Sequence, residues 1–446
     1  MRAKAYPKYR QSGVEWLGEV PEDWDLKKLK HSCQLMTLKT ESRQNPVALE
    51  NIESWTGRFV ETESEFEGEG IAFIKKDILF GKLRPYLAKV LKAEKDGEAV
   101  GDFFVLRPSQ EVVSDYMAFL LRSEDYIKII DGSTFGSKMP RASWDFMGSL
   151  PIPVPPLSEQ QSIASFLDRE TGRIDALIGK KQRLVELVKE KRTALISRAV
   201  TKGLDPKVKM KPSGVEWLGE VPEYWETIRL KFLLQENLMY GANESAEDDN
   251  PDNPRFIRIT DIDDNGQLRH DTFKSLPREV AGPYLLVDGD ILLARSGATV
   301  GKSIRYRKSW GDCCFAGYLI RARVEKTTIT PEFLDACCQS AFYWQYIVGS
   351  QIQATIQNVS AEKYANLILP VPPLREQQSI SSFLSLETSK LDALISKVNQ
   401  AILTLKEYRT ALISAAVTGK IEIKDEVGRM KDEIETKEEI GRMKDE

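Results

Sequence analysis

The sequence predicts an internally duplicated α+β protein, built from two α/β domains and two long helices that pack on each other as a coiled coil. Three observations lead to this fold class. They are a long repeat, a heptad pattern of apolar residues at the end of each repeat, and short strand-like runs between the repeated blocks. The chain has 446 residues, about three times the length of a typical domain, so several domains are expected.

Two blocks of sequence occur twice. The opening motif SGVEWLGEVPEDW of residues 12–24 returns as SGVEWLGEVPEYW at 213–225. A longer block contains a proline-rich hinge, PVPPL, and begins at residue 150 in the first copy and at residue 367 in the second. By contrast, the segments between these blocks show no clear alignment, so a repeated scaffold holds two different inserts. The expected parts are an opening motif and first α/β domain at 1–156, a helix at 157–203, a second opening motif and α/β domain at 204–373, a second helix at 374–420 and a charged tail at 421–446.

Each hinge is followed by a predicted helix. Prolines resist helix formation, so the helices are expected to begin near Ser158 and Arg375. Apolar residues then recur every seven residues, which is typical of a coiled coil. An amphipathic helix docked on a globular core is the alternative. The expected contact positions are Leu167, Ile174, Val188 and Leu195 in the first helix and Leu384, Leu391, Val398, Leu405 and Leu412 in the second, with Ile163, Glu170, Leu177, Leu184 and Lys191, and Ile380, Glu387, Leu394, Ala401 and Tyr408, between them.

The segments between the blocks combine strand-like and helix-like runs. Strands are expected in DILFGKLRPYLAKV and DFFVLRP of the first segment, and in RFIRITDI, DGDILLARSG and FAGYLIRARV of the second. Helices are expected in the runs that follow Ser114 and Thr330, residues of the type that caps a helix N-terminus. This mixture predicts an α/β domain in each half.

The composition excludes several classes of protein. Apolar residues make up 41% and charged residues 29% of the chain, which is typical of globular rather than disordered proteins. No apolar run approaches the roughly 18 residues of a membrane span, and the N-terminus lacks the apolar segment of a secretion signal. Five cysteines, four of them in adjacent pairs, do not form a disulfide framework. We therefore expect a reduced, cytoplasmic protein without membrane contact.

The motifs that resemble catalytic or metal-binding sites do not have the residue spacing that such sites require. SGATVGKS resembles a phosphate-binding loop, but three rather than four residues separate Gly297 from Gly301. The adjacent cysteines lack the C-x-x-C spacing of zinc sites, and the two histidines, His31 and His270, are far from them in sequence. We expect no catalytic residue, metal or cofactor in this chain, although pairs of carboxylates leave an enzyme open as an alternative.

Candidate DNA contacts are local, because the net charge of −4 gives no global attraction to nucleic acid. Seven basic and two acidic residues lie between Gly289 and Arg323, and alternation is expected to place Arg305 and Arg307 on one strand face. Polar loops at 132–144 and 349–360 add further groups, since Arg and Lys suit guanine or phosphate, and Gln and Asn suit adenine. Solvated faces and plain connecting loops are the alternatives. The candidates are Lys82, Arg84, Lys138 and Arg141 in the first half, and Arg295, Lys302, Arg305, Arg307, Gln351, Gln353 and Asn358 in the second.

The repeated motifs resemble a known family. SGVEWLGEVPE-x-W, PVPPL-x-EQQSI and RTALIS-x-AVT, each present twice, are similar to the specificity subunit of type I restriction-modification systems. DILFGKLRPYLAKV and DILLARSGATVGK resemble segments of that family's target-recognition domains. The resemblance extends from Tyr6 to about Lys420 and implies two target-recognition domains separated by an antiparallel coiled coil of two long helices.

The resemblance also implies a function and a set of partners. Each recognition domain would read one half of a split, asymmetric target in double-stranded DNA. The helices would dock two methyltransferase subunits and, through them, the restriction and translocase subunits. S-adenosylmethionine, ATP and magnesium would belong to those partner subunits. Two alternatives from other classes are a self-contained enzyme acting on DNA or nucleotides, and a coiled-coil adaptor without DNA binding.

Overall fold

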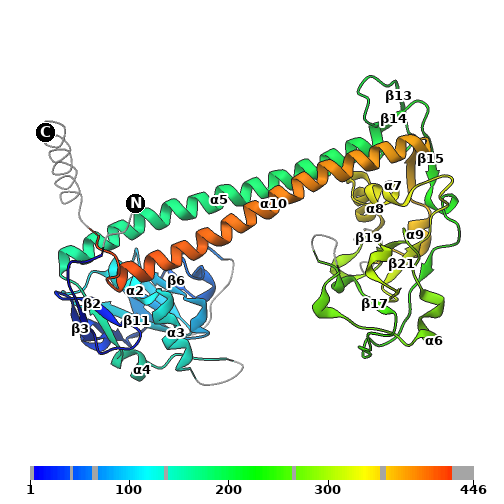
Figure 1. Ribbon diagram of the computed structural model, residues 1–446. Helices are drawn as coiled ribbons and strands as arrows, with labels where there is room; N and C mark the ends of the chain where they lie inside the picture. The colour runs from blue at the N-terminus through cyan, green and yellow to red at the C-terminus, as the bar shows by residue number, and fades with distance from the viewer. Residues whose placement is uncertain are drawn as a thin grey trace, which may run out of the picture. The chain divides into compact units, whose positions relative to one another are not determined.

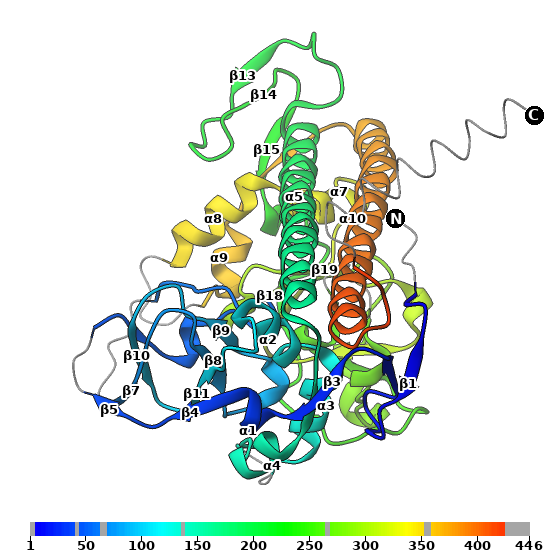
Figure 2. The same ribbon diagram turned by 90° about the vertical axis from the view of Figure 1, so that its left-hand side faces the viewer.

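The computed structural model describes residues 5–40, 44–62, 69–134, 139–263, 268–351 and 358–423 (Figure 1). It contains two compact units. The first comprises residues 1–182 and 400–446, and the second comprises residues 183–399. Helices α5 (Leu157–Lys202) and α10 (Leu374–Val417) pack side by side, and each contributes about half of its length to each unit (Figures 1 and 2).

The first unit contains two four-stranded sheets. In the sheet with the order β4-β11-β8-β9, β11 is an inner strand, and its Val105 lies opposite both Met36 and Leu79. The sheets have the orders β4-β11-β8-β9 and β5-β7-β10-β6, with β4 at Cys33–Met36, β11 at Phe103–Pro108, β8 at Ile78–Gly81, β9 at Val90–Lys92, β5 at Lys39–Thr40, β7 at Gly70–Phe73, β10 at Gly97–Val100 and β6 at Pro46–Val47. The remaining elements are β1 (Tyr9–Gln11) paired with β2 (Glu19–Pro21), β3 (Asp25–Lys28) paired with β12 (Pro151–Val154), and helices α1 (Leu29–Ser32), α2 (Ser114–Leu121), α3 (Glu124–Gly132) and α4 (Trp144–Ser149).

The strand β8 is apolar on both faces because both faces are covered. Ile78 and Phe80 join a core that also contains residues of α2, α5 and α10, including Leu167 and Val417. Leu79 points to the opposite face and joins a second core with Phe103 and Val105. A strand covered on both sides reads as a continuous apolar run, which is how it appears in the sequence.

The second unit repeats this plan with a different sequence. Its four-stranded sheet has the order β16-β21-β18-β19, and a parallel pair, β17-β20, accompanies it. The elements are β16 (Met239–Tyr240), β17 (Arg255–Ile257), β18 (Ile291–Ala294), β19 (Ser303–Arg305), β20 (Cys313–Phe315), β21 (Leu319–Ala322), α6 (Arg278–Ala281), α7 (Pro331–Cys338), α8 (Ala341–Gln351) and α9 (Ala361–Ala365), with β13 (Met210–Pro212) paired with β14 (Glu220–Pro222) and β15 (Glu226–Arg229) paired with β22 (Ile368–Val371). The predicted strand runs and both helical runs are thus confirmed, although each helical run is divided into two helices.

The predicted helix caps have different outcomes. The Thr330 hydroxyl accepts a hydrogen bond from the Phe333 amide and caps α7, as expected. Ser114 does not cap α2, because it is the first helical residue and Val113 occupies the cap position. That prediction was wrong by one residue.

The coiled-coil stripe is partly different from the expected one. Leu167, Ile174, Val188, Leu384 and Val398 are buried, and Leu195, Leu391, Leu405 and Leu412 are half-buried. Ile163 and Ile380 are buried in the domain cores and Ala401 is half-buried, but Leu177, Leu184, Leu394 and Tyr408 are exposed. The second row of contact residues lies one position C-terminal to the interleaved positions that the sequence predicted, where apolar residues also occur. These contacts are Thr171, Ile178, Val185, Thr388, Ile395, Ile402 and Arg409.

A buried glutamine fixes the start of each long helix to its α/β domain. The Gln160 side-chain oxygen accepts from the Val113 amide at 2.8 Å, and its Nε2 donates to the carbonyls of Glu111 and Pro155 at 3.0 and 2.8 Å. Gln377 of the second copy accepts from the Thr330 amide at 2.8 Å and donates to two carbonyls in the same way. Each amide therefore uses both of its N–H donors and its oxygen in joining a hinge, a helix and a domain.

Replacing this glutamine should destabilise the unit that contains it. Gln160→Leu removes the side-chain partner of three backbone groups, the Pro155 carbonyl in a buried site and the Val113 amide and Glu111 carbonyl in partly buried ones, so we expect a loss of about 3 kcal/mol of unfolding free energy. The neighbouring Gln161 is exposed, so Gln161→Leu should change stability by less than about 0.5 kcal/mol. Urea unfolding of the two variants measures the difference, and equal losses would contradict the role of the buried amide.

Each opening motif contacts the C-terminal end of a long helix. Lys420, just past α10, donates to the carbonyls of Leu17 and Glu19 at 2.9 and 2.5 Å. Gly419 has a φ of +73°, and a Cβ there would collide with Pro21. A glycine in this left-handed conformation is the usual end of a helix, and here it also makes room for the motif.

Candidate nucleic-acid interface

In the first unit, candidates from two distant segments meet. Leu83 in the loop after β8 forms a β-bridge with Arg141, and flanking hydrogen bonds join the Arg84 amide to the Pro140 carbonyl and the Ala142 amide to the Lys82 carbonyl, at 2.8 and 2.9 Å. This short ladder places Lys82, Arg84 and Arg141 on neighbouring strands of backbone. In the sequence these residues belong to two separate segments, Lys82 and Arg84 to one and Arg141 to the other.

The ladder carries a mixed charge. The guanidinium of Arg141 donates to Asp102 at 2.9 Å, and its side chain is 60% exposed. The Lys82 ammonium lies 4.8 Å from the centre of the Phe104 ring. Burial, against the attraction of Asp102, lowers the pKa of Lys82. Arg84 is exposed, so a cationic, partly apolar surface faces solvent.

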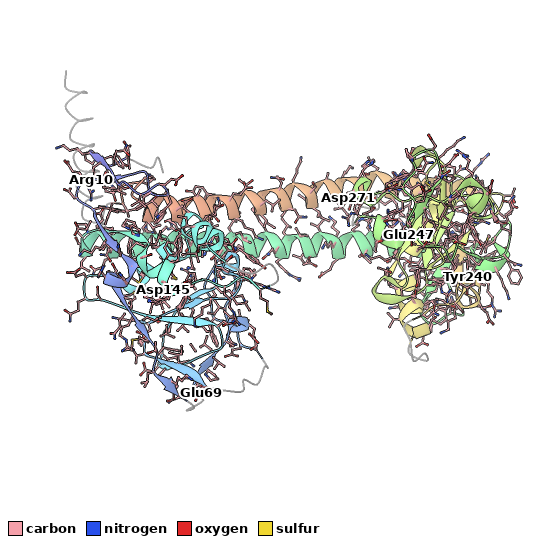
Figure 3. All side chains as sticks on the ribbon, turned by 90° about the horizontal axis from the view of Figure 1, so that it is seen from below. Arg10, Glu69, Asp145, Tyr240, Glu247 and Asp271 are labelled. Carbon is pink, nitrogen blue, oxygen red and sulfur yellow. The ribbon has the colours of Figure 1, made fainter. Side chains whose placement is uncertain are left out.

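The second unit has the same ladder. Ser296 forms a β-bridge with Asn358, and the Val359 amide donates to the Arg295 carbonyl at 2.8 Å. The Arg295 amide donates to the carbonyl of Tyr318, whose side chain is 70% exposed. The Arg295 guanidinium lies 4.7 Å from the centre of the Tyr240 ring. Tyr240 lies at the surface of this unit (Figure 3).

The two ladders correspond position by position. In the first unit the Lys82 amide donates to the backbone carbonyl of Asp102, as the Arg295 amide does to the carbonyl of Tyr318 in the second. The corresponding pairs are Lys82 with Arg295, Arg84 with Gly297, Asp102 with Tyr318, and Arg141 with Asn358. One backbone frame therefore presents two different sets of side chains. The segment that resembles a phosphate-binding loop is simply this loop in the second unit, between β18 and β19.

Comparison with known proteins identifies the family. A model of the type I restriction modification DNA specificity domain matches residues 21–187 and 222–404, which is most of the chain and both halves of the repeat. The chain belongs to this family of specificity subunits. The specificity subunit of the MjaVIII type I restriction enzyme from Methanocaldococcus jannaschii is 23% identical over 91% of this chain and 95% of its own length. The EcoBI specificity subunit of Escherichia coli is 22% identical over 84% of this chain and 85% of its own.

A solved structure shares the fold. One chain, from work described as the structural basis underlying complex assembly and conformational transition of the type I R-M system, superposes with a TM-score of 0.68. It is 17% identical and covers 89% of this chain and 98% of its own. The antiparallel helix pair and the two α/β domains are thus those of a DNA specificity subunit of a type I restriction enzyme.

The remaining basic candidates of this specificity subunit differ in their surroundings. Lys302 and Arg307 are exposed. Arg305 is the last residue of β19 and forms ion pairs with Glu332 and Asp335 of α7, so it does not share a strand with Arg307 as predicted. Lys138, Gln353 and the side chain of Gln351 lie outside the described residues.

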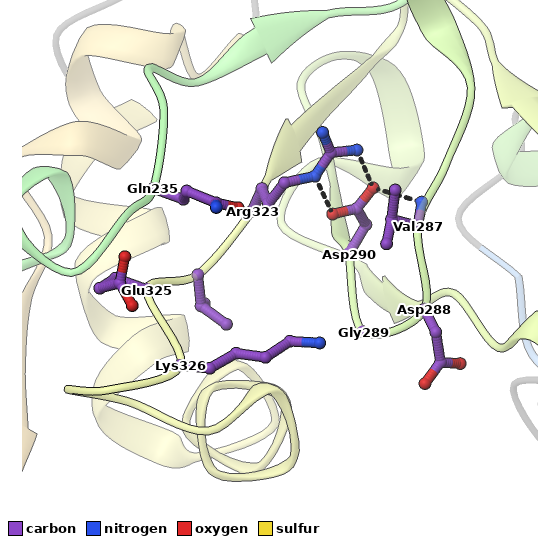
Figure 4. Close-up of a pocket in the computed structure, with 9 residues that line it drawn as sticks. Gln235, Val287, Asp288, Gly289, Asp290, Arg323, Glu325 and Lys326 are labelled. Atoms are coloured by element: carbon purple, nitrogen blue, oxygen red, sulfur yellow. Dashed lines mark hydrogen bonds and ion pairs between the residues drawn. The ribbon is translucent and has the colours of Figure 1, made fainter.

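Two arginines of the basic cluster are paired with carboxylates of their own domain. Arg323 forms a bidentate pair with the buried Asp290 at 2.8 and 2.7 Å, and Asp290 also accepts from the Val287 amide (Figure 4). Asp290 raises the pKa of Arg323. Arg321 pairs with Glu236 at 2.8 Å. The pocket beside Asp290 is therefore lined by groups that stabilise a turn, as Asp77 and Arg107 do in the first unit.

Other chemistry finds little support in the described part of the chain. There, no group of His, Cys, Asp and Glu side chains could hold a metal ion. The five cysteines are buried and unpaired, and burial raises the pKa of each of them. Within these same ranges, every helix is too short or too polar to span a membrane.

Proposed function

We propose that each α/β domain reads one half of a split DNA target and that the two halves differ in sequence. The observation that carries this proposal is the pair of matching ladders with different side chains. Arg and Lys favour guanine or phosphate, whereas Asn favours adenine, so the same frame would read different bases in the two units. In this proposal the recognition domains are residues 1–156 and 204–373.

Individual roles follow from exposure and charge. Arg141 and Arg84 would contact bases or phosphates of the first half-site, with Lys82 as a partly buried support. Arg295 and Asn358 would act at the second half-site, with Lys302 and Arg307 on phosphates. Arg305 is held by α7 carboxylates, so we expect a smaller role for it than for Arg307. Lys138, Gln351 and Gln353 stay in the proposal as loop residues next to these ladders in sequence.

The two helices, residues 157–203 and 374–420, would dock two methyltransferase subunits, and restriction subunits would join through them. Exposed apolar side chains on both helices support this assignment, since large apolar groups on a soluble surface mark contact sites. They include Leu177, Leu184, Leu187, Leu386, Leu394, Leu403 and Tyr408. S-adenosylmethionine, ATP and magnesium would be bound by the partner subunits.

Single substitutions in the ladders should affect one half-site each. Arg141→Ala should reduce discrimination at the first half-site, and Asn358→Ala at the second, by roughly 1–3 kcal/mol. The measurement is the affinity of the complex with its methyltransferase subunits for duplexes altered in one half only. Arg173→Ala, an exposed arginine on α5, serves as the control and should change neither half-site. A loss at the opposite half-site in either variant would overturn the assignment.

A further inference from the structure

Two ion pairs join the long helices at positions related by the repeat. Arg192 of α5 donates from Nε to Asp392 of α10 at 3.0 Å. Arg409 of α10 donates from Nε to Asp175 of α5 at 2.9 Å. The two pairs differ in burial, since the side chains of Arg409 and Asp175 are 9% and 11% exposed, against 29% and 48% for Arg192 and Asp392. The pair in the first unit is therefore the less solvated one.

The buried pair is also bonded to the first α/β domain. The second oxygen of Asp175 accepts from the Arg58 guanidinium at 2.8 Å, and Arg409 donates to the Trp55 carbonyl at 3.2 Å. Arg58 and Trp55 belong to one tight turn, closed by the hydrogen bond from the Glu53 amide to the Arg58 carbonyl at 2.9 Å. Asp175 thus contacts both of the other parts of its unit, the opposite helix and the domain.

A third arginine distinguishes the two sites. Arg122 follows α2, and Gln339 follows α7 at the corresponding position of the repeat. Gln339 accepts a hydrogen bond from Arg192 at 3.1 Å. Arg122 instead donates to the Thr56 carbonyl of the same tight turn, and its buried Nε has no partner among the described residues.

The positive charge of Arg122 makes the ion-pair site of the first unit depend on the negative charge of Asp175. Burial, and then the positive charge of Arg409, lower the pKa of Arg122 to about 10, whereas Asp175 acts in the opposite direction. Arg122 stays charged at neutral pH, so two poorly solvated guanidinium groups, those of Arg122 and Arg409, lie near Asp175, while Asp115 and Asp168 attract Arg122 more weakly. Asp175 is the one of these carboxylates that also pairs with Arg409. Removing that carboxylate charge would leave the two guanidinium groups to repel each other.

We infer that Asp175 is the positioning residue that fixes the first α/β domain on the helix pair, and that its counterpart Asp392 has a weaker role because Gln339 is neutral. This inference rests on the proposed half-site function, because the position of the domain is expected to determine how well it discriminates its half of the target.

The test compares Asp175→Asn with Asp392→Asn in the full complex with methyltransferase subunits. For each variant, affinity is measured for duplexes carrying both correct half-sites or a changed first or second half-site. Asp175→Asn should reduce discrimination at the first half-site about tenfold and leave the second unchanged. Asp392→Asn should reduce discrimination at the second by less than about threefold. A general loss of stability would lower the active fraction but would leave these ratios unaltered.

Two further variants keep the inference falsifiable if Asp175→Asn folds poorly. Arg58→Gln removes only the domain's link to Asp175, and should give a smaller loss confined to the first half-site. Arg122→Gln places a neutral glutamine where the second unit has Gln339. Combined with Asp175→Asn in a double variant, it should restore most of the discrimination that Asp175→Asn loses. Equal effects of Asp175→Asn and Asp392→Asn on their half-sites, or no rescue by Arg122→Gln, would overturn the inference. A wild-type complex without two separable half-sites would instead refute the proposed function.

Discussion

Lengthening both long helices by one heptad should move methylation to targets whose gap is about three base pairs longer, with both half-sites unchanged. Seven helical residues add ~10.5 Å at ~1.5 Å per residue. At ~3.4 Å per base pair this corresponds to about three base pairs, less whatever DNA bending absorbs. Sites with the original gap should lose methylation almost completely, so the effect is a change of target rather than a reduction in rate.

The structure indicates where the heptads belong. Tandem duplication of residues 184–190 in α5 and of 401–407 in α10 repeats a pair of contact residues in each helix, namely Val185 with Val188 and Ile402 with Leu405. Both segments begin midway between the ion-pair residues of their helix, so neither ion pair is interrupted. Sequencing of methylated sites in a host that expresses the complex reads out the gap.

Duplication in α5 alone is the control, because it mismatches the helix pair and should abolish methylation. Full methylation at the original gap in the double duplication would show that the helices do not set the spacing.

Replacing the first recognition segment with the second should convert an asymmetric target into a palindrome. In this variant residues 227–366 replace residues 26–149, at boundaries set by the flanking repeats. The hinge contacts of Gln160 should survive, because Gln377 makes the same contacts with the incoming segment. The exchange also brings Gln339 to the place of Arg122, next to Arg409.

The expected methylated motif is an inverted repeat of the second half-site, because equal domains on an antiparallel helix pair are related by a twofold axis. The original motif should disappear. Its persistence would contradict half-site reading by these segments. Exchange of the first opening motif alone, which differs from the second at one of thirteen positions, is the matched control and should leave the motif unchanged.

The sequence predicted the elements that depend on local pattern, because the repeat, the proline hinges and the heptads are all visible along the chain. It did not predict the second coiled-coil stripe. Apolar residues occur at both possible positions, Leu177 and Ile178 for example, and only packing on the opposite helix and the domain selects Ile178. A heptad count cannot make this choice.

The candidate site was predicted in pieces for a related reason. Arg321 is one of the seven basic residues between Gly289 and Arg323, and its carboxylate partner, Glu236, is 85 residues away in sequence and so is not visible in a local charge count. The correspondence between Lys82 and Arg295 was also hidden, since it depends on hydrogen bonds between backbone groups and not on side-chain identity. Charge composition pointed to segments of the chain, but it could not separate exposed cations from those already paired.

The loop between β8 and β9 has the same backbone conformation as its counterpart in the second unit, although the two sequences differ. In the second unit its two left-handed positions are Gly297 and Gly301, which adopt positive φ at little cost. In the first unit the same positions are Arg84 and Ala88, with φ of +51° and +46°, and a non-glycine residue there costs on the order of 1 kcal/mol. The backbone path is therefore the same in the two units, although the residues of the first unit do not favour it. The same loop conformation thus holds different side chains in the two units, which is what the proposed reading of two different half-sites requires.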